Sequence, residues 1–238
     1  MSTAVESFVF PSDFQQESLK LINSLLVLKS SAFFLVDPNM SHRGLVTHNL
    51  AQEDDNLYQN RYMHMDPLNP KMHESSGETV VHMDSIMTPQ VISQLVYYQD
   101  FLKPRNYRYV ADIFFRCEGK IIAVITMLRE PLQGDFTEAE LTLLRRLQPF
   151  LEYTINTVYM PRRLAERAAL EMCHQLTDRQ LDVLELVVSG ASNKAIAEQL
   201  NLGLATVKTH LQHIYHKTGV VSRAELLSQV ISDLKLIT

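Results

Sequence analysis

Apolar and polar positions recur with helical spacing along the last quarter of the chain. Between residues 176 and 230 they form four short segments, each of which follows a helix-start signal. Thr177 and Gln180 stand three residues apart before the first segment, the spacing of a capping box, in which each side chain bonds the backbone N–H of the other residue. Ser222 and Glu225 repeat that spacing before the last segment. The pattern predicts four helices, which start after Thr177, Ser192, Gly203 and Ser222.

The third segment, residues 204 to 218, separates its apolar and polar positions most clearly. Val207, Leu211 and Ile214 recur at four and three and form one apolar stripe. The opposite side carries small and polar side chains without a carboxylate, namely Ala205, Thr209, Gln212, His216 and, beside them, Lys208. Two short helices joined by a tight turn, the second with a polar face free of acids, are typical of proteins that place a helix in the major groove of DNA.

The stretch from Ser192 to Arg223 resembles the LuxR/NarL-type helix-turn-helix family. Its residues are SNKAIAEQLNLGLATVKTHLQHIYHKTGVVSR, and the family pattern is close to SNKEIA, then L-x-L-S-x-x-T-V-K-x-H, then K-x-x-V-x-x-R. Ala195 replaces a usual Glu, and Gly203 replaces a usual capping Ser, for which Gly is an acceptable substitute. The resemblance implies an all-α, four-helix DNA-binding domain of a transcriptional regulator.

The resemblance also places Lys208, Thr209 and Gln212 where base edges are contacted, and the helical spacing puts the same residues on the outer face. Lys can donate to guanine and Gln suits adenine, whereas the Thr methyl can meet the methyl of thymine. We expect phosphate contacts from flanking side chains of the second and third helices: Asn193, Lys194, Thr206, His210, His213 and Lys217. For the histidines, exposure to solvent without any contact is an open alternative.

The pattern before residue 160 mixes the spacings of helices and strands. It predicts helices over 17–29, 54–64, 92–103 and 138–159, and strands over 32–36, 44–48, 109–117 and 121–129. Residues 37–39 and 66–90 are rich in turn formers and are predicted to be loops. The strand over 121–129 is apolar on both faces, so we expect it in the middle of a sheet that is covered on both sides.

These elements predict an α/β domain with a mostly antiparallel sheet flanked by helices. Its layout resembles the GAF/PAS-like domains that precede this helix-turn-helix in many regulators, and FTEAELTLLRRLQPFL resembles their last helix. We expect a domain for ligand sensing and dimerisation over 1–160, a helical or flexible linker over 161–174, and the DNA-binding domain over 175–238.

The charge balance favours a homodimer. The formal net charge is −5, but acidic and basic residues cancel from Gln175 onward, so the excess acid lies before that point. Because neutralised phosphates supply most non-specific affinity, a neutral module should bind DNA weakly alone, and two should act on half-sites about 10 base pairs apart. Two apolar seams are candidate dimer surfaces: Leu226, Leu227 and Val230 on the fourth helix, and Leu141, Leu144, Leu151, Ile155 and Val158 over 138–159, which can instead pack on the sheet.

Composition indicates a cytoplasmic protein. Hydrophobic residues make up 46% of the 238 residues, yet no apolar run approaches the length that crosses a bilayer, and the N-terminus lacks the pattern of a signal peptide. Two cysteines, Cys117 and Cys173, suit a reducing compartment. We therefore expect no membrane partner.

Two types of sensor domain are alternatives for residues 1–160. A phosphorylated receiver needs an acidic pair after its first strand, but only Asp37 follows 32–36, which argues against it. An acyl-homoserine-lactone sensor is the sharper alternative, because Tyr58, Tyr62 and Asp66 resemble the aromatic residues and aspartate of that pocket. Against this, the spacing from Tyr62 to Asp66 is short and the chain has no Trp, so ordinary packing of these tyrosines stays the simpler interpretation.

Other chemistry has weaker support. Met and His occur together at 63–65, 72–73 and 82–83, but no spacing fixes a metal geometry, and we expect no metal or cofactor. No phosphate-binding loop, nucleophile elbow or grouped catalytic residues occur, so we expect no enzyme. The sequence predicts a dimeric transcriptional regulator of double-stranded DNA that is controlled by a small-molecule effector; a quorum-sensing regulator and a dimeric regulator without a ligand remain alternatives.

Overall fold

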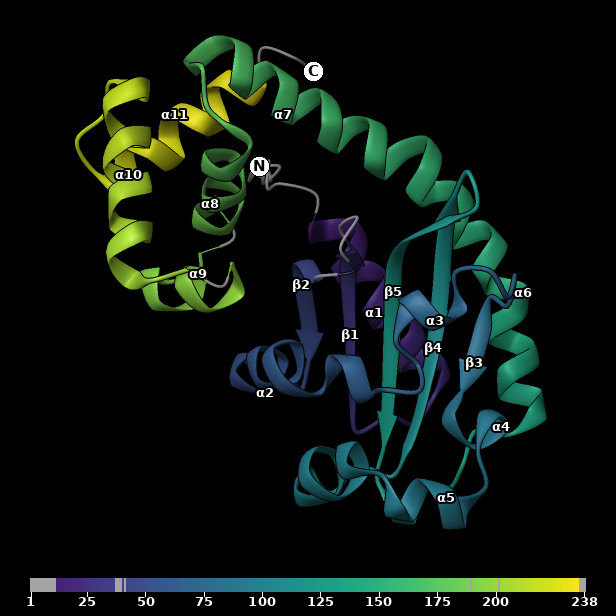
Figure 1. The fold of residues 1–238 in the computed structure, drawn as a ribbon. Helices are drawn as coiled ribbons and strands as arrows, with labels where there is room; N and C mark the ends of the chain where they lie inside the picture. The colour runs from purple at the N-terminus through teal and green to yellow at the C-terminus, as the bar shows by residue number, and fades with distance from the viewer. Residues whose placement is uncertain (1–11, 37–39, 41, 189, 201, 236–238) are drawn as a thin grey trace, which may run out of the picture. The chain divides into compact units, whose positions relative to one another are not determined.

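The computed structural model describes residues 12–36, 40, 42–188, 190–200 and 202–235 (Figure 1). The chain forms two compact units, one over residues 14–157 and one that begins at Val158. The turn expected at 37–39 lies outside the described residues.

The N-terminal unit is built on one antiparallel sheet. Its strands are β1 (Ser30–Val36), β2 (His42–His48), β3 (Val80–His82), β4 (Tyr109–Cys117) and β5 (Lys120–Arg129), in the order β2-β1-β5-β4-β3. The central position of β5 confirms the interpretation of its apolar faces. A two-residue turn joins β4 to β5, and both Glu118 (φ 50°) and Gly119 (φ 83°) lie in the left-handed region that such hairpin turns require. The predicted fold class is thereby confirmed for this unit.

One face of the sheet is covered by α1 (Ser12–Leu25) and α6 (Glu138–Thr154). Phe33 of β1 and Phe115 of β4 stack on this face with their ring centroids 5.8 Å apart. The helix predicted over 17–29 ends four residues early, because the Lys29 N–H bonds Leu128 O and draws the chain into the sheet. Helix α6 continues through a π-helical segment, η6 (Ile155–Tyr159).

The seam of α6 packs on the sheet and is not a dimer surface. Four of its five predicted members, Leu141, Leu144, Leu151 and Ile155, are buried in the protomer itself. Exposed apolar side chains of α6, Phe150 and Tyr153, lie on its other face. Of the two alternatives for this seam, packing within the protomer is the correct one.

The other face of the sheet is covered by short helical segments. They are α2 (Gln52–Leu57), the π-helical η1 (Tyr58–Tyr62), the 3₁₀ turn η2 (Met63–Met65), α3 (Pro70–His73), α4 (Met83–Ile86), α5 (Pro89–Gln94), the π-helical η3 (Tyr97–Leu102) and the 3₁₀ turn η4 (Lys103–Arg105); a further 3₁₀ turn, η5 (Pro131–Gln133), precedes α6. Two predictions were wrong here. Residues 66–90 hold α3, β3 and α4 rather than a loop, and the helix over 92–103 breaks at Leu95, whose backbone is extended (ψ 133°).

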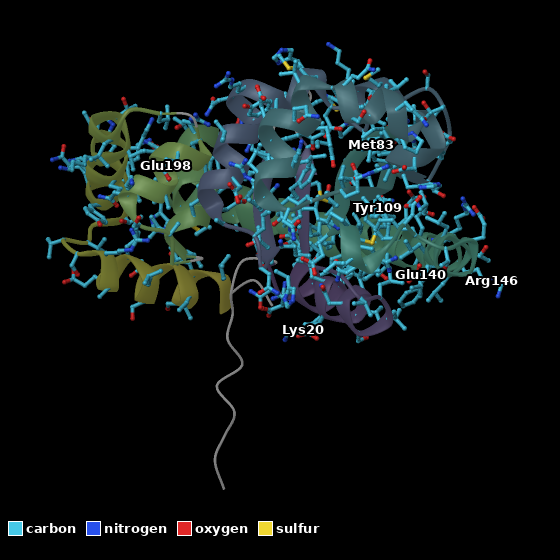
Figure 2. The ribbon with its side chains drawn as sticks, turned by 90° about the horizontal axis from the view of Figure 1, so that it is seen from below. Lys20, Met83, Tyr109, Glu140, Arg146 and Glu198 are labelled. Atoms are coloured by element: carbon cyan, nitrogen blue, oxygen red, sulfur yellow. The ribbon has the colours of Figure 1, made fainter. Side chains whose placement is uncertain are left out.

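An ion pair between the buried Arg129 and the partly buried Glu140 fixes the start of α6 on the sheet. Arg129 donates to both carboxylate oxygens of Glu140, at 2.6 and 3.2 Å, and its guanidinium lies over the Phe136 ring. Glu140, labelled in Figure 2, also accepts from the Thr137 backbone and completes the predicted capping box. These hydrogen bonds, first that of Arg129, lower the pKa of Glu140 from 4.5 to about 2.

The Glu140 ion pair predicts a pH-dependent loss of stability. Because the folded-state pKa is depressed, the stabilisation is complete above the unfolded pKa near 4.5 and is lost as the pH falls toward 2. Glu140→Gln should therefore lower the free energy of unfolding by about 2–3 kcal/mol near neutral pH and by much less near pH 3, as urea titrations at each pH would measure. The control Glu138→Gln, at a side chain 82% exposed, should change little at any pH. A deficit for Glu140→Gln that stays constant with pH would contradict the ion-pair account.

In its described residues, the C-terminal unit consists of helices and the short segments that join them. It contains α7 (Met160–His174), α8 (Asp178–Val188), α9 (Asn193–Gln199), α10 (Leu204–Thr218) and α11 (Arg223–Lys235). Helices α8 to α11 are the four that the sequence predicts. The two predicted capping boxes differ in detail. The side chains of Thr177 and Gln180 each accept a hydrogen bond from the backbone N–H of the other residue. The Ser222 hydroxyl accepts from the Glu225 N–H, but the Glu225 carboxylate accepts from the Val221 N–H rather than from that of Ser222.

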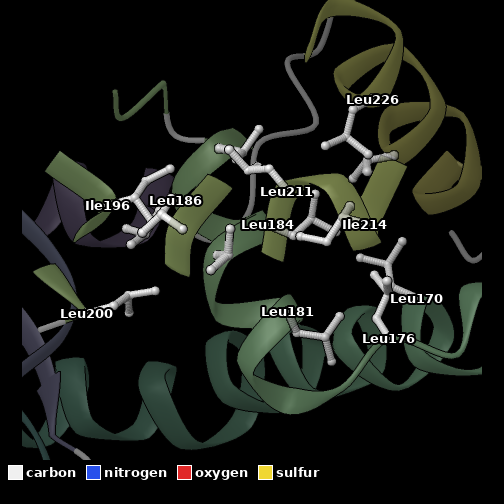
Figure 3. Packing of buried hydrophobic residues seen from close by; sticks show 14 of the residues in the cluster. Leu170, Leu176, Leu181, Leu184, Leu186, Ile196, Leu200, Leu211, Ile214 and Leu226 are labelled. Atoms are coloured by element: carbon white, nitrogen blue, oxygen red, sulfur yellow. The ribbon is translucent and has the colours of Figure 1, made fainter. Parts of the chain in front are cut away.

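The core of this unit takes residues from all five helices, and Figure 3 shows Leu170 of α7, Leu184 of α8, Ile214 of α10 and Leu226 of α11 among them. Leu226 and Val230 are both 0% exposed, so the fourth helix cannot offer these two side chains to a second protomer, while a dimer contact through its other residues stays a prediction. Leu227 is only partly buried against the same core.

Helix α7 is built into the C-terminal unit. Besides Leu170, it contributes Arg163 and Arg167, which donate to Glu185 of α8 at 2.6 and 2.9 Å. The segment expected as a helical or flexible linker is therefore a helix, while the domain boundaries given from the sequence stay a prediction.

Candidate nucleic-acid interface and ligand pocket

Helices α9 and α10 form the expected pair of helices. The Ser192 hydroxyl accepts from the Ala195 N–H at 3.2 Å and starts α9, whereas Gly203 starts α10 without a side-chain bond. Helix α10 ends at Gly219, whose φ of 73° suits a residue without a Cβ. Val207, Leu211 and Ile214 point into the core, as predicted, and so the opposite side of α10 faces solvent.

That outer face presents the residues predicted to meet base edges. Lys208, Thr209 and Gln212 are all exposed. The Thr209 hydroxyl donates to Ala205 O at 3.1 Å, which leaves its methyl group as the contact available to a thymine methyl. Because α10 has no Asp or Glu, nothing on this helix repels a phosphate backbone. The structure therefore brings the three residues together on one surface, and their contacts with DNA stay a prediction.

The residues predicted to contact phosphates differ in their exposure to solvent. Lys194, Thr206 and His213 are exposed, and Asn193 is partly exposed. His210 is partly buried, and this burial, together with Arg179 and His213, lowers its pKa and favours the uncharged ring.

Lys217, also predicted to touch a phosphate, has a role inside the unit. Its ammonium donates to Gln175 O at 2.6 Å and to Gln180 Oε1 at 2.9 Å, which leaves one N–H for a phosphate. Arg223 has a similar internal role, since it donates to Val187 O and Ala191 O and so ties α11 to the end of α8.

The N-terminal unit contains a pocket between its sheet and the short helices. The space between atoms is about 560 Å³, including the open mouth. Its lining residues are Ala32, Phe34, His42, Leu50, Asp54, Asp55, Tyr58, Asp66, Pro70, Tyr97, Phe101, Tyr107, Asp112, Thr126 and Leu128. Such an apolar pocket with a few convergent polar groups is the usual form of a small-molecule site.

Two of the three residues proposed for ligand binding meet in this pocket. The Tyr58 hydroxyl donates to Asp66 Oδ2 at 2.8 Å, and the Leu68 N–H donates to Asp66 Oδ1 at 2.8 Å. Burial raises the pKa of Asp66, although these hydrogen bonds and one from Tyr97 partly offset it. Tyr62 does not line the pocket; it packs behind it on Phe101, with the ring centroids 5.2 Å apart.

Sequence reasoning missed Tyr97, Phe101 and Asp112, which complete the pocket wall. Tyr97 and Phe101 stack with centroids 5.6 Å apart, which is the i,i+4 pairing of a helical turn. Asp112 is a lone carboxylate within the apolar run of β4, and that contrast was a usable signal.

Two of the Met and His residues considered as metal ligands have other contacts. Met83 is buried in the core, and the His73 ring bonds Pro67 O at 2.9 Å and stacks on Phe114. In the part of the chain that the structure describes, no three His, Cys, Asp or Glu side chains are grouped as metal ligands would be. Nor does any described helix combine the length and apolar character that crossing a bilayer requires.

Comparisons with known proteins agree with this arrangement. Residues 174–230 match the family described as bacterial regulatory proteins, luxR family. The monoamine regulon transcriptional regulator of Klebsiella aerogenes is 34% identical over 212 residues, covering 89% of this chain and 87% of that protein.

Two solved structures are also similar. The GAF domain/HD domain protein from Geobacter sulfurreducens is 14% identical and covers 65% of this chain and 97% of its own (TM-score 0.46). Escherichia coli SdiA is 12% identical and covers 100% of this chain and 93% of its own (TM-score 0.43).

Proposed function

The chain belongs to the luxR family of bacterial regulatory proteins, and from this premise we propose that a small molecule bound in its N-terminal unit controls binding of its α10 face to operator DNA. The observation that carries the DNA half of this proposal is the exposed, acid-free face of α10 with Lys208, Thr209 and Gln212. Since phosphates lie on both sides of a groove, side chains flanking this face would fix the helix in it.

The pocket supports the sensor half of the proposal. It combines aromatic walls with the buried acids Asp66 and Asp112, which a purely structural domain has no need to bury. By its name, the relative from Klebsiella aerogenes regulates a monoamine regulon, and we propose that this chain likewise controls genes that respond to a small organic molecule. The Tyr58–Asp66 hydrogen bond keeps an acyl-homoserine lactone as a second candidate effector.

The connection between the units supports coupling. The chain passes from α6 to α7 through the π-helical segment η6, and the units divide at Val158, within that segment. Such segments recur at functional sites of other proteins. An effector would act by favouring one of two arrangements of the DNA-binding units, since it must bind one arrangement more tightly than the other.

A gel-shift and sedimentation experiment on the full-length protein tests this function. At low salt, random duplexes should be bound, with an affinity that falls steeply as salt rises, because the contacts replace counterions on phosphates. A selected site should sediment with two protomers per duplex, since one neutral module makes few phosphate contacts. Duplexes that all remain free at low salt, with the protein folded, would contradict the proposal.

A further inference from the structure

Asp112 is a carboxylate buried in the sheet and directed at the pocket. It lies on β4, opposite Thr126 of β5 and Val81 of β3, and is 4% exposed. Its side chain bonds Thr126, but Oδ1 has no hydrogen-bond partner among the described residues. An unpaired buried carboxylate oxygen costs free energy, so this position calls for a donor from a bound molecule.

The charges around the pocket are unbalanced toward acid. Asp54 is paired with Arg105 at 2.6 Å. The Asp55 carboxylate forms hydrogen bonds with the His42 ring at 2.7 Å and with the Gln59 amide at 2.6 Å. None of the described lining residues is Lys or Arg, although Arg105 lies over the ring of the lining residue Phe101 at 4.4 Å from its centroid.

Neither Asp66 nor Asp112 pairs with a Lys or Arg among the described residues, although the nearby His42 lowers the pKa of Asp66. Asp66 accepts hydrogen bonds from Tyr58, Tyr97 and the Leu68 N–H, all of them uncharged groups. Burial raises the pKa of Asp112 well above its ordinary range, and the nearby Asp66 raises it further. Because burial disfavours the charged form of both acids, a bound anion would disfavour their ionisation further, whereas a bound cation would favour it.

The walls of the pocket suit a cation with an apolar body. Rings of Tyr58, Tyr97 and Phe101 line it within 6.0 Å of one another, and such faces attract an ammonium group. The rest of the wall includes Leu50 and Leu128, which would take a hydrocarbon group.

Resting on the sensor function proposed above, we propose that this pocket binds a protonated primary amine carried on a small aromatic or aliphatic group. Asp112 Oδ1 accepts one ammonium N–H, Asp66 accepts a second through its one remaining lone pair, and the aromatic rings cover the charge. The apolar body of the amine lies against Leu50 and Leu128.

Calorimetry on the full-length protein tests the ligand class with probes matched in shape. The probes are butylamine and 2-phenylethylamine, the alcohols 1-butanol and 2-phenylethanol, and the anion 3-phenylpropanoate. At least one amine should bind at millimolar concentration or below, while its alcohol and the anion should not. Asp112→Asn should weaken that amine at least about 10-fold, since a charge-assisted hydrogen bond is lost. The matched control Asp100→Asn, at an exposed carboxylate outside the pocket lining, should leave its affinity unchanged.

The Asn variant is expected to fold, because it keeps the shape of the side chain and removes a buried acid; its circular dichroism would check this. The inference is overturned if no amine binds, if an alcohol binds as tightly as its amine, or if Asp112→Asn binds the amine like the unchanged protein. Binding of N-octanoyl-homoserine lactone with no binding of amines would overturn it as well. Gel shifts with each probe separate the two proposals. An amine that binds without altering DNA affinity would contradict the proposed control of DNA binding but not the amine site. A lactone that alters DNA affinity would contradict the amine as ligand class but not the proposed control of DNA binding.

Discussion

Lys208→Ala is expected to weaken binding of the full-length protein to its selected DNA site by about 1–3 kcal/mol, and to relax base preference at one position. Lys208 is exposed on the outer face of α10, opposite the buried stripe of Val207, Leu211 and Ile214. Truncating it should not disturb the core, so the loss would report on DNA contact. Gln212→Ala should relax preference at a different base, because each side chain meets its own base pair. Competition gel shifts against single-base variants of the site would measure both.

A matched lysine makes that test specific. Lys71→Ala removes the same charge from an exposed position of the N-terminal unit and should change DNA affinity by less than about 0.5 kcal/mol. If Lys208→Ala loses affinity equally for every sequence, the residue touches a phosphate rather than a base. An unchanged affinity and footprint would show that another surface contacts DNA.

Leu170→Ala is expected to destabilise the C-terminal unit by about 2–5 kcal/mol. Leu170 lies on α7, within the segment 161–174, and is 0% exposed in the core that α8, α10 and α11 share (Figure 3). Truncating it leaves a cavity among residues such as Leu176 and Leu181. Hydrogen exchange of the α8 and α11 amides, with urea unfolding followed by circular dichroism, would measure the loss.

Leu164 provides the control on the same helix. It is the same residue type, is 57% exposed, and should cost less than about 0.5 kcal/mol when replaced by Ala. Equal and small effects at both positions would mean that α7 does not pack with α8 to α11 and acts as a connector only.

Short-range signals predicted the helices of the C-terminal unit well. The bonds that start α8 and α9 join residues three apart, Thr177 with Gln180 and Ser192 with Ala195, so both partners lie within one window of sequence. The same holds for Thr137 and Glu140 at the start of α6. The central place of β5 was predictable for a different reason, because a strand that is covered on both sides is apolar on both of its faces.

Long-range contacts decided what the sequence did not predict. Strand β3 is three residues long and exists because Val80 pairs with Ile113 of β4, far along the chain. The end of α1 depends on the bond between the Lys29 N–H and Leu128 O. No local pattern contains those partners.

The pocket residues also divide into those that nearby sequence could indicate and those that long-range contacts bring there. Tyr58 and Asp66 lie eight residues apart, were named together with Tyr62 as candidate ligand-binding residues, and are hydrogen-bonded to each other. Asp112 reaches the same pocket only because β4 lies beneath the short helices, so its position follows from the sheet.

The internal bonds of Lys217 and Arg223 have an evolutionary consequence. Both residues belong to the K-x-x-V-x-x-R part of the family pattern, and both hold backbone carbonyls of neighbouring helices. Lys208 and Gln212, which are predicted to contact base edges, make none of those bonds. We therefore predict that mutation of Lys208 or Gln212 changes the preferred promoter sequence and leaves the packing of the helices intact, so that promoter choice can evolve separately from the fold.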